Sequence, residues 1–155
     1  MKRIISLLLA VITVVSITAC NSTTEKNKGI FVKLVVNCKE VIENLENDTY
    51  AISDEKAEII PENGVIYEAV SNCEDGKSAY DFLVECLQKE KIHYEGADGY
   101  IKAIGNIYEG DCGKYSGWMF YINGEIAEVG SSDYIVKEND EIEFKYVVDY
   151  MKLFE

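Results

Sequence analysis

The N-terminal segment combines a positive start with an apolar run that is too short to cross a membrane. Lys2 and Arg3 precede the run Ile4–Ile17, in which only three residues are polar. As a helix this run would extend about 21 Å, whereas the hydrocarbon core of a bilayer is about 30 Å thick. This arrangement is typical of a secretory signal peptide, which is removed and takes no part in the folded domain. We therefore predict an exported protein with a signal peptide at residues 1–19.

The apolar run ends at a cysteine that is a candidate for lipidation. The sequence Ile17-Thr18-Ala19-Cys20 resembles the lipobox of bacterial lipoprotein signals, in which the cysteine is acylated and becomes the first mature residue. The alternative is an ordinary signal peptide with an incidental cysteine. Two or more acyl chains would hold the protein stably at a membrane, where one would be marginal. We predict a lipid anchor at Cys20, a polar tether over residues 20–28, a domain over residues 29–155, and a location on the extracytoplasmic face of the cell membrane.

The charge of the chain limits its partners. The sequence has 15 basic and 28 acidic residues, and loss of Lys2 and Arg3 leaves a formal charge of −15. Such a surface repels the phosphate backbone of nucleic acids and anionic lipid headgroups. We expect no nucleic-acid partner, and we expect the anchor, not a basic face, to hold the domain at the membrane.

Four cysteines remain after Cys20. They are Cys38, Cys73, Cys86 and Cys112. An even number of cysteines outside the cytoplasm indicates disulfides, and four cysteines allow three pairings. The alternative is a metal site, but the chain has no C-x-x-C pair, and its only histidine, His93, lies in a strand-like segment. We therefore favour disulfides over zinc.

The hydrophobic pattern predicts an α+β domain. The clearest helix signal follows Ser78, where apolar residues recur with the spacing of one buried face up to Leu87. The clearest hairpin signal is Asn123-Gly124, because these residues tolerate the positive φ angles of a type I′ turn. The expected elements are strands at 30–36 and 66–71, a helical turn at 41–45 followed by a loop, a helix at 78–91, extended segments at 92–94 and 99–108, hairpin strands at 118–122 and 125–129, and a last strand at 141–149. This order fits a β-grasp-like, mostly antiparallel sheet packed on one main helix.

Two segments around the hairpin carry a resemblance to a known family. They are Ile107–Gly113 and Ser116–Gly124, and weaker matches are Pro61–Ile66, Lys91–His93 and Asn139–Glu143. Together they resemble the transcobalamin-like C-terminal domain family, domain of unknown function 4430. This family is similar to the β-domain that closes over cobalamin in the animal vitamin carriers, where a larger helical barrel holds the other side of the vitamin. The present sequence contains no such barrel, so the resemblance implies half of a binding site, from which a ligand would gain limited burial.

The resemblance also implies a disulfide between Cys38 and Cys112. Relatives often carry one further cysteine near Gly130–Ser132 and another after the last strand, and both are absent here. Cys73 and Cys86 then remain, and a bridge closing that loop of about fourteen residues would contribute about 3 kcal/mol. The alternative is that Cys86 is a small buried hydrophobic residue.

Aromatic residues near the hairpin are the candidates for ligand binding. The chain has eleven tyrosines, and strand alternation places Trp118 and Phe120 on one face and Tyr121 on the other. One face is expected to be core, and the other could form a platform for a flat ligand or a protein. The candidate residues are Tyr115, Trp118, Phe120, Tyr121 and Tyr134.

The sequence does not support catalysis. Any cysteine–histidine pair must use His93, and no phosphate loop, nucleophile elbow or zinc-protease helix is present. Carboxylates in or near turns, namely Asp111, Asp133, Asp140 and Glu141, raise calcium as a minor hypothesis, although their spacing is not that of an EF-hand. We therefore expect no enzyme and no resident cofactor or metal, but a binding module for a cobalamin-like or other flat ligand. The alternatives are a cell-surface protein-interaction module and a divalent-metal-binding protein.

Overall fold

A computed structural model of the chain describes residues 29–47 and 50–154. The predicted signal peptide, Cys20 and the tether lie outside the described residues. Within the described part of the chain, no helix is both long and apolar enough to cross a bilayer.

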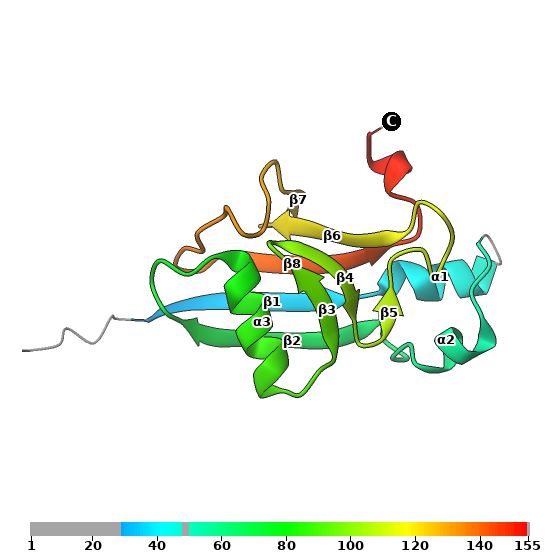
Figure 1. Ribbon diagram of the computed structural model, residues 1–155, viewed down its shortest axis with the longest axis horizontal. Helices are drawn as coiled ribbons and strands as arrows, with labels where there is room; N and C mark the ends of the chain where they lie inside the picture. Colours follow the sequence, from blue (N-terminus) through cyan, green and yellow to red (C-terminus); the bar gives the residue numbers. More distant parts are fainter. Residues whose placement is uncertain (1–28, 48–49, 155) are drawn as a thin grey trace, which may run out of the picture.

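A mixed five-stranded sheet forms the centre of the domain (Figure 1). Its strands, in spatial order, are β2 (Val65–Cys73), β1 (Ile30–Asn37), β8 (Glu141–Val147), β6 (Gly117–Ile122) and β7 (Glu125–Ile126). The first and last long strands, β1 and β8, run parallel in the middle of the sheet, and the other pairs are antiparallel. Parallel central strands flanked by antiparallel neighbours are the β-grasp arrangement, so the predicted fold class is confirmed.

One helix and a small second sheet lie against the same face of the large sheet (Figure 1). The helix is α3 (Ala79–Lys89), and the small sheet contains β3 (Tyr94–Ala97), β4 (Tyr100–Ile104) and β5 (Ile107–Tyr108). Helix α3 begins after Ser78, whose hydroxyl accepts a hydrogen bond from Asp81 N (3.1 Å) and donates one to Asp81 Oδ2 (2.8 Å). Ser78 therefore caps the helix in the manner of a capping box, with Asp81 in the place where Glu or Gln is usual.

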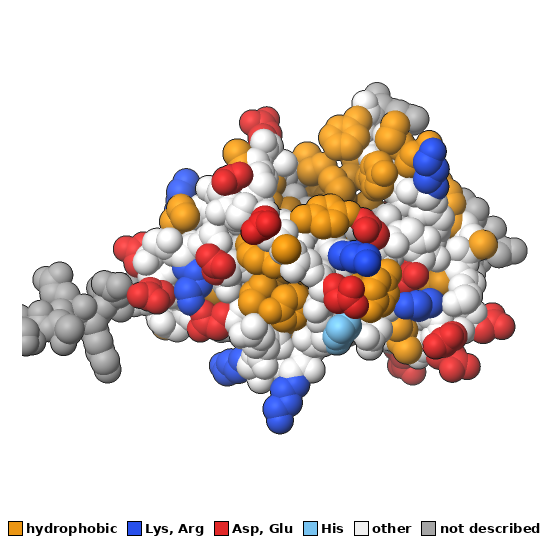
Figure 2. All heavy atoms as spheres, in the orientation of Figure 1, with side chains coloured by type: hydrophobic (Ala, Val, Ile, Leu, Met, Phe, Trp, Pro, Cys, Tyr) orange, Lys and Arg blue, Asp and Glu red, His pale blue; other side chains and the backbone are white. Residues whose placement is uncertain are grey.

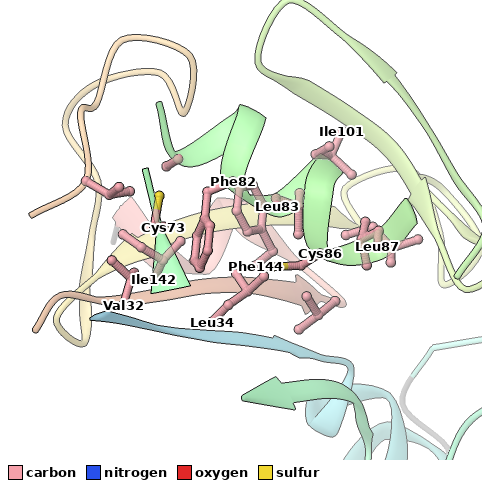
Figure 3. Close-up of a cluster of buried hydrophobic side chains, with 14 residues drawn as sticks. Val32, Leu34, Cys73, Phe82, Leu83, Cys86, Leu87, Ile101, Ile142 and Phe144 are labelled. Atoms are coloured by element: carbon pink, nitrogen blue, oxygen red, sulfur yellow. The ribbon is translucent and has the colours of Figure 1, made fainter. Parts of the chain in front are cut away.

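Side chains from one face of the strands and one face of α3 form the core between the two layers (Figure 3). On β1 every second residue, Val32, Leu34 and Val36, is fully buried beneath α3, and Phe31 on the other side is 55% exposed. Figure 3 shows Phe82 and Leu83 of α3 directed toward this core. A second, smaller cluster contains Cys38, Val41, Ile107, Cys112 and Tyr146. The residues assigned to these two clusters lie between Ile30 and Val148, so the chain that follows the predicted tether contains both.

The expected elements differ from the structure chiefly in three places, besides the division of the extended segment expected at 99–108 into β4 and β5. The helical turn expected at 41–45 is a nine-residue helix, α1 (Lys39–Asn47), and a further short helix, α2 (Asp54–Glu58), follows it. The apolar signal is weak there because α1 buries only Val41 and Asn44. Polar contacts compensate, since the Asn44 side chain accepts from Tyr50 N and donates to Tyr50 O.

The other two differences concern strands. The return strand expected at 125–129 is only the two residues of β7, which pair with Tyr121 and Ile122. The extended segment expected at 92–94 begins later, so His93 lies one residue before β3. The Asn123-Gly124 turn is confirmed, with φ angles of 53° and 86°. Residues Tyr150–Phe154 form a short 3₁₀ helix, η1, for which the sequence pattern carried no prediction.

Candidate functional site

An open hollow of about 350 Å³ lies where β4, the β5–β6 loop, β6 and η1 meet. Its lining residues are Tyr100, Glu109, Gly110, Lys114, Ser116, Gly117, Trp118, Met119 and Tyr150. Three of them are aromatic, one is acidic and one is basic. The hollow therefore combines flat apolar walls with groups that can form hydrogen bonds and ion pairs.

Trp118 forms a fixed wall of the hollow. Its indole N–H donates to Ile107 O (2.9 Å), and its ring meets the Tyr146 ring edge-on, with centroids 5.3 Å apart. The residue is only partly buried, so part of its surface remains available to the hollow. Trp118 thus belongs both to the packing of the domain and to the site.

Tyr100 and Tyr150 form two further walls. Tyr100 is 60% exposed, and its hydroxyl donates to the Glu109 carboxylate. Tyr150 is held by the adjacent loop, because its N–H donates to Tyr115 O (2.9 Å) and its ring packs edge-on against Tyr115 at 5.8 Å. These two rings come from β4 and η1, which are far apart in the sequence.

A buried hydrogen-bond network fixes the loop that lines the floor. Tyr146 of β8 is fully buried, and its hydroxyl donates to Tyr108 O (2.8 Å) and shares a hydrogen bond with Ser116 Oγ (2.9 Å). The same Ser116 oxygen accepts from Cys112 N (3.1 Å). Burial raises the pKa of Tyr146, so its hydroxyl stays protonated and able to donate. Tyr146 therefore positions the loop from Tyr108 to Ser116 without lining the hollow.

Glu109 and Lys114 give the hollow charges of both signs. Both are exposed, and Lys114 Nζ lies 5.0 Å from the centre of the Tyr115 ring. A cation over an aromatic face is attracted by the ring quadrupole, which holds the ammonium group near the rim. The arrangement suits a ligand with a flat apolar body and a polar edge.

The structure does not bring the five aromatic candidates together on one surface. Trp118 lines the hollow and Tyr115, 41% exposed, lies at its rim. Phe120 instead stacks on Phe144 with centroids 5.2 Å apart. Tyr134 packs edge-on against Phe120 at 6.2 Å and donates its hydroxyl to Asp140 Oδ2.

Tyr121 lies on the opposite side of β6 from Phe120. Strand alternation separates these neighbours, and Lys145 Nζ is 5.9 Å from the centre of the Tyr121 ring. Only Trp118 and Tyr115 thus belong to the hollow or its rim. The other three candidates pack elsewhere, and Tyr134 also lines a separate hollow beside the β6–β7 turn.

Sequence reasoning did not select Tyr100, Glu109, Lys114 or Tyr150 as site residues. Glu109 lies within the segment that carries the family resemblance, and Lys114 directly follows Ile107–Gly113, so closeness to that segment was an available signal. Tyr150 had no such signal, because only the tertiary fold brings the C-terminal residues beside β6.

The four described cysteines are buried and are free thiols in the structure. Cys38 and Cys112 share the second hydrophobic cluster, and burial, with a smaller contribution from Cys112, raises the pKa of Cys38 to about 11. Burial likewise raises the pKa of Cys112 and of Cys73 to about 11. Figure 3 shows Cys73 and Cys86 on either side of Phe82. Both disulfides stay predictions.

The carboxylates considered for calcium take part in turns. Asp140 accepts hydrogen bonds from Tyr134 Oη and Lys137 N, and Asp111 accepts from Tyr108 N and pairs with Lys56 at 3.2 Å. Among the residues that the structure describes, no three metal-ligating side chains of the Cys, His, Asp or Glu type are grouped as an ion would need.

The fold and the hollow define a small α+β domain of the β-grasp type with an open aromatic site. Residues 76–147 match the model of the family described as Domain of unknown function (DUF4430). The family predicted from the sequence is therefore confirmed for this part of the chain, which includes α3, β3–β6 and β8.

Two solved structures resemble the domain. A crystal structure of haptocorrin in complex with Cbi matches with a TM-score of 0.50 and 12% identity, covering 78% of this chain and 25% of the haptocorrin chain. The present chain thus spans about a quarter of the length of that protein, and the likeness concerns the fold. A structure described as a "putative metal binding protein" from Ruminococcus gnavus ATCC 29149 matches with a TM-score of 0.41 and 15% identity, covering 76% of this chain and 96% of that one. Among curated proteins, none matches this chain.

Proposed function

We propose that this chain is an exported lipoprotein, anchored through Cys20, whose domain is a non-enzymatic module that binds a flat amphipathic ligand in the hollow. Corrinoids are the first candidate class. They combine a flat ring system with polar amide side chains, which corresponds to aromatic walls beside Glu109, Lys114 and Ser116. The haptocorrin structure of similar fold contains Cbi, which supports the choice of probe.

The observation that carries the proposal is the group of three aromatic side chains around one open hollow. Tyr100, Trp118 and Tyr150 come from three separate elements, yet all of them line the same space. A volume of about 350 Å³ is near the lower end of the range for small-molecule sites, roughly 300–1,000 Å³. The hollow is therefore suited to one face or edge of a larger flat ligand, whose remainder would project outward.

The lining favours binding over catalysis. Ser116 is the hydroxyl residue on the floor, and its oxygen is engaged by Cys112 N, Gly113 O and Tyr146 Oη. Of the residues that line the hollow in the described structure, none is a histidine or a cysteine. Activation of a serine nucleophile requires an adjacent general base, and this lining supplies no imidazole for that role.

Trp118 provides a direct assay because it is the single tryptophan of the chain. A corrinoid titrated into the chain of residues 21–155 should change Trp118 emission, and isothermal calorimetry should give a matching dissociation constant. Replacing Tyr150 by Ala removes one wall and should weaken binding about tenfold, the effect of one good aromatic contact. Phe31→Ala is a matched control, because Phe31 is 55% exposed and does not line the hollow.

Two results would reject the corrinoid version. One is no heat and no change in emission at millimolar corrinoid. The other is equal weakening by Tyr150→Ala and Phe31→Ala, which would place the binding elsewhere.

The anchor is tested separately by mass spectrometry. Protein from the membrane fraction should begin at an acylated Cys20, whereas an intact Met1 on cytosolic protein would contradict export and lipidation.

A further inference from the structure

Several exposed hydrophobic side chains gather at the rim of the hollow. Figure 2 shows hydrophobic side chains gathered at the upper right of the view, over the C-terminal segment. The exposed rim residues are Tyr100 (60%), Tyr115 (41%), Met151 (49%), Leu153 (38%) and Phe154 (70%). Other exposed large hydrophobic residues lie elsewhere in the chain: Val70 is on β2, and Ile135 is in the segment between β7 and β8. A contiguous apolar patch beside an open site indicates a surface that is covered by a partner.

The charged groups at the hollow indicate which kind of partner could cover it. The chain has a formal net charge of −13, so most of its surface would repel a second copy. The hollow is different, because it presents one carboxylate, Glu109, and one ammonium, Lys114. A surface with one group of each sign can match itself, since a two-fold rotation places each lysine opposite the other copy's glutamate.

We propose that two copies of this chain pair face to face through this rim, so that each hollow is closed by the other copy. The apolar residues of η1 would be buried in the contact, and Glu109 and Lys114 would form reciprocal ion pairs at its edge. Copies tethered to one membrane would be concentrated there, which favours pairing without tight affinity in solution.

The pairing would complete a site that is open in one copy. A flat ligand in the single hollow has one face against Tyr100, Trp118 and Tyr150, and the other face in water. In the pair, the second copy would supply the same three rings from the opposite side. This step rests on the proposed function of the hollow, whereas the pairing itself is measurable without any ligand.

Sedimentation equilibrium of the chain of residues 21–155, over a series of protein concentrations, tests the pairing. We expect reversible dimers without ligand. Phe154→Asp should raise the dimer dissociation constant about tenfold or more, because it places a charge in the apolar contact. Val70→Asp is the matched control, since Val70 is 66% exposed but lies on β2, away from the rim. If Phe154→Asp fails to fold by circular dichroism, Met151→Lys takes its place.

A charge exchange provides the sharper test. Lys114→Glu and Glu109→Lys should each weaken the dimer, because like charges would then meet across the two-fold axis. The double variant restores opposite charges and should recover the dimer.

A monomer at every concentration, with or without corrinoid, would overturn the pairing, as would a dimer that Val70→Asp disrupts and Phe154→Asp does not. Failure of the double variant to recover the dimer would overturn the reciprocal ion pairs. A dimer that binds no corrinoid would leave the pairing intact and reject only the ligand assignment.

Discussion

Removing one hydroxyl group from the buried network tests how the hollow is held together. Tyr146→Phe keeps the ring that packs against Trp118 and deletes the oxygen that contacts Tyr108 O at 2.8 Å and Ser116 Oγ at 2.9 Å. The substitution therefore changes hydrogen bonding while leaving the apolar packing in place.

The expected loss of stability depends on which hydrogen bonds Tyr108 O and Ser116 Oγ keep after the substitution. Tyr108 O still accepts from Asp111 N (3.1 Å), and Ser116 Oγ keeps Cys112 N and Gly113 O. No partner is left wholly unpaired, so the larger penalty for an orphaned buried group does not apply. The Tyr146 hydroxyl has one proton, which Tyr108 O accepts, and Ser116 can keep its own proton on Gly113 O. Loss of one buried hydrogen-bond donor predicts that the free energy of unfolding falls by about 1 kcal/mol.

Urea unfolding followed by circular dichroism measures this difference. Tyr94→Phe is the matched control, because its hydroxyl bonds Gln88 at an exposed position and its loss should cost less than about 0.5 kcal/mol. Tyr146→Phe should also weaken ligand binding, since the floor loop loses its support, although Tyr146 does not line the hollow. Equal stability of the two variants would refute the role assigned to the network.

Three further predictions concern other parts of the domain. Ser78→Ala removes the cap of α3 and should lower the free energy of unfolding by about 1 kcal/mol in urea titrations, whereas no loss would show that the cap is dispensable. Burial first, and then the hydrogen bond to Asp140, raises the pKa of Tyr134 to about 12. Its neutral form therefore stabilises the fold below pH 10, the ordinary tyrosine pKa, and this contribution is lost as the pH rises toward 12. Tyr134→Phe should show a shallower fall in the urea midpoint over that window than the parent protein, and parallel curves would contradict the assignment. Peptide mapping of the exported protein should join Cys38 to Cys112, and this loop of about 74 residues would contribute about 4 kcal/mol, which reduction should remove. Recovery of both cysteines as alkylated thiols would reject that bridge.

The sequence predicts those elements whose periodicity is set by one buried face. Helix α3 was predicted to within two residues because its apolar residues repeat along one stripe and Ser78 starts it. Strand β1 is predicted by its β-branched residues, and strand β8 by side chains that alternate between the core and the opposite face. The turn at Asn123-Gly124 followed from the backbone conformations that these two residues tolerate.

The elements that depend on tertiary contacts were less predictable. Helix α1 is fixed partly by the Asn44 side chain, and η1 is held through the backbone contact between Tyr150 and Tyr115. The same limit applied to the site, because Tyr100 and Tyr150 become neighbours of Trp118 only when β4 and η1 pack beside β6.

Trp118 illustrates why aromatic content alone does not define a binding surface. The residue lines the hollow, but its indole N–H bonds Ile107 O and its ring packs against Tyr146. Trp118→Ala would therefore disturb the core and the site together, and a loss of binding in that variant would not separate the two causes. Tyr100 and Tyr150 line the same hollow from outside the two buried clusters, so their removal leaves the core in place. These two tyrosines, with Trp118 kept as the fluorescent reporter, are the side chains on which a binding function of this hollow can be decided.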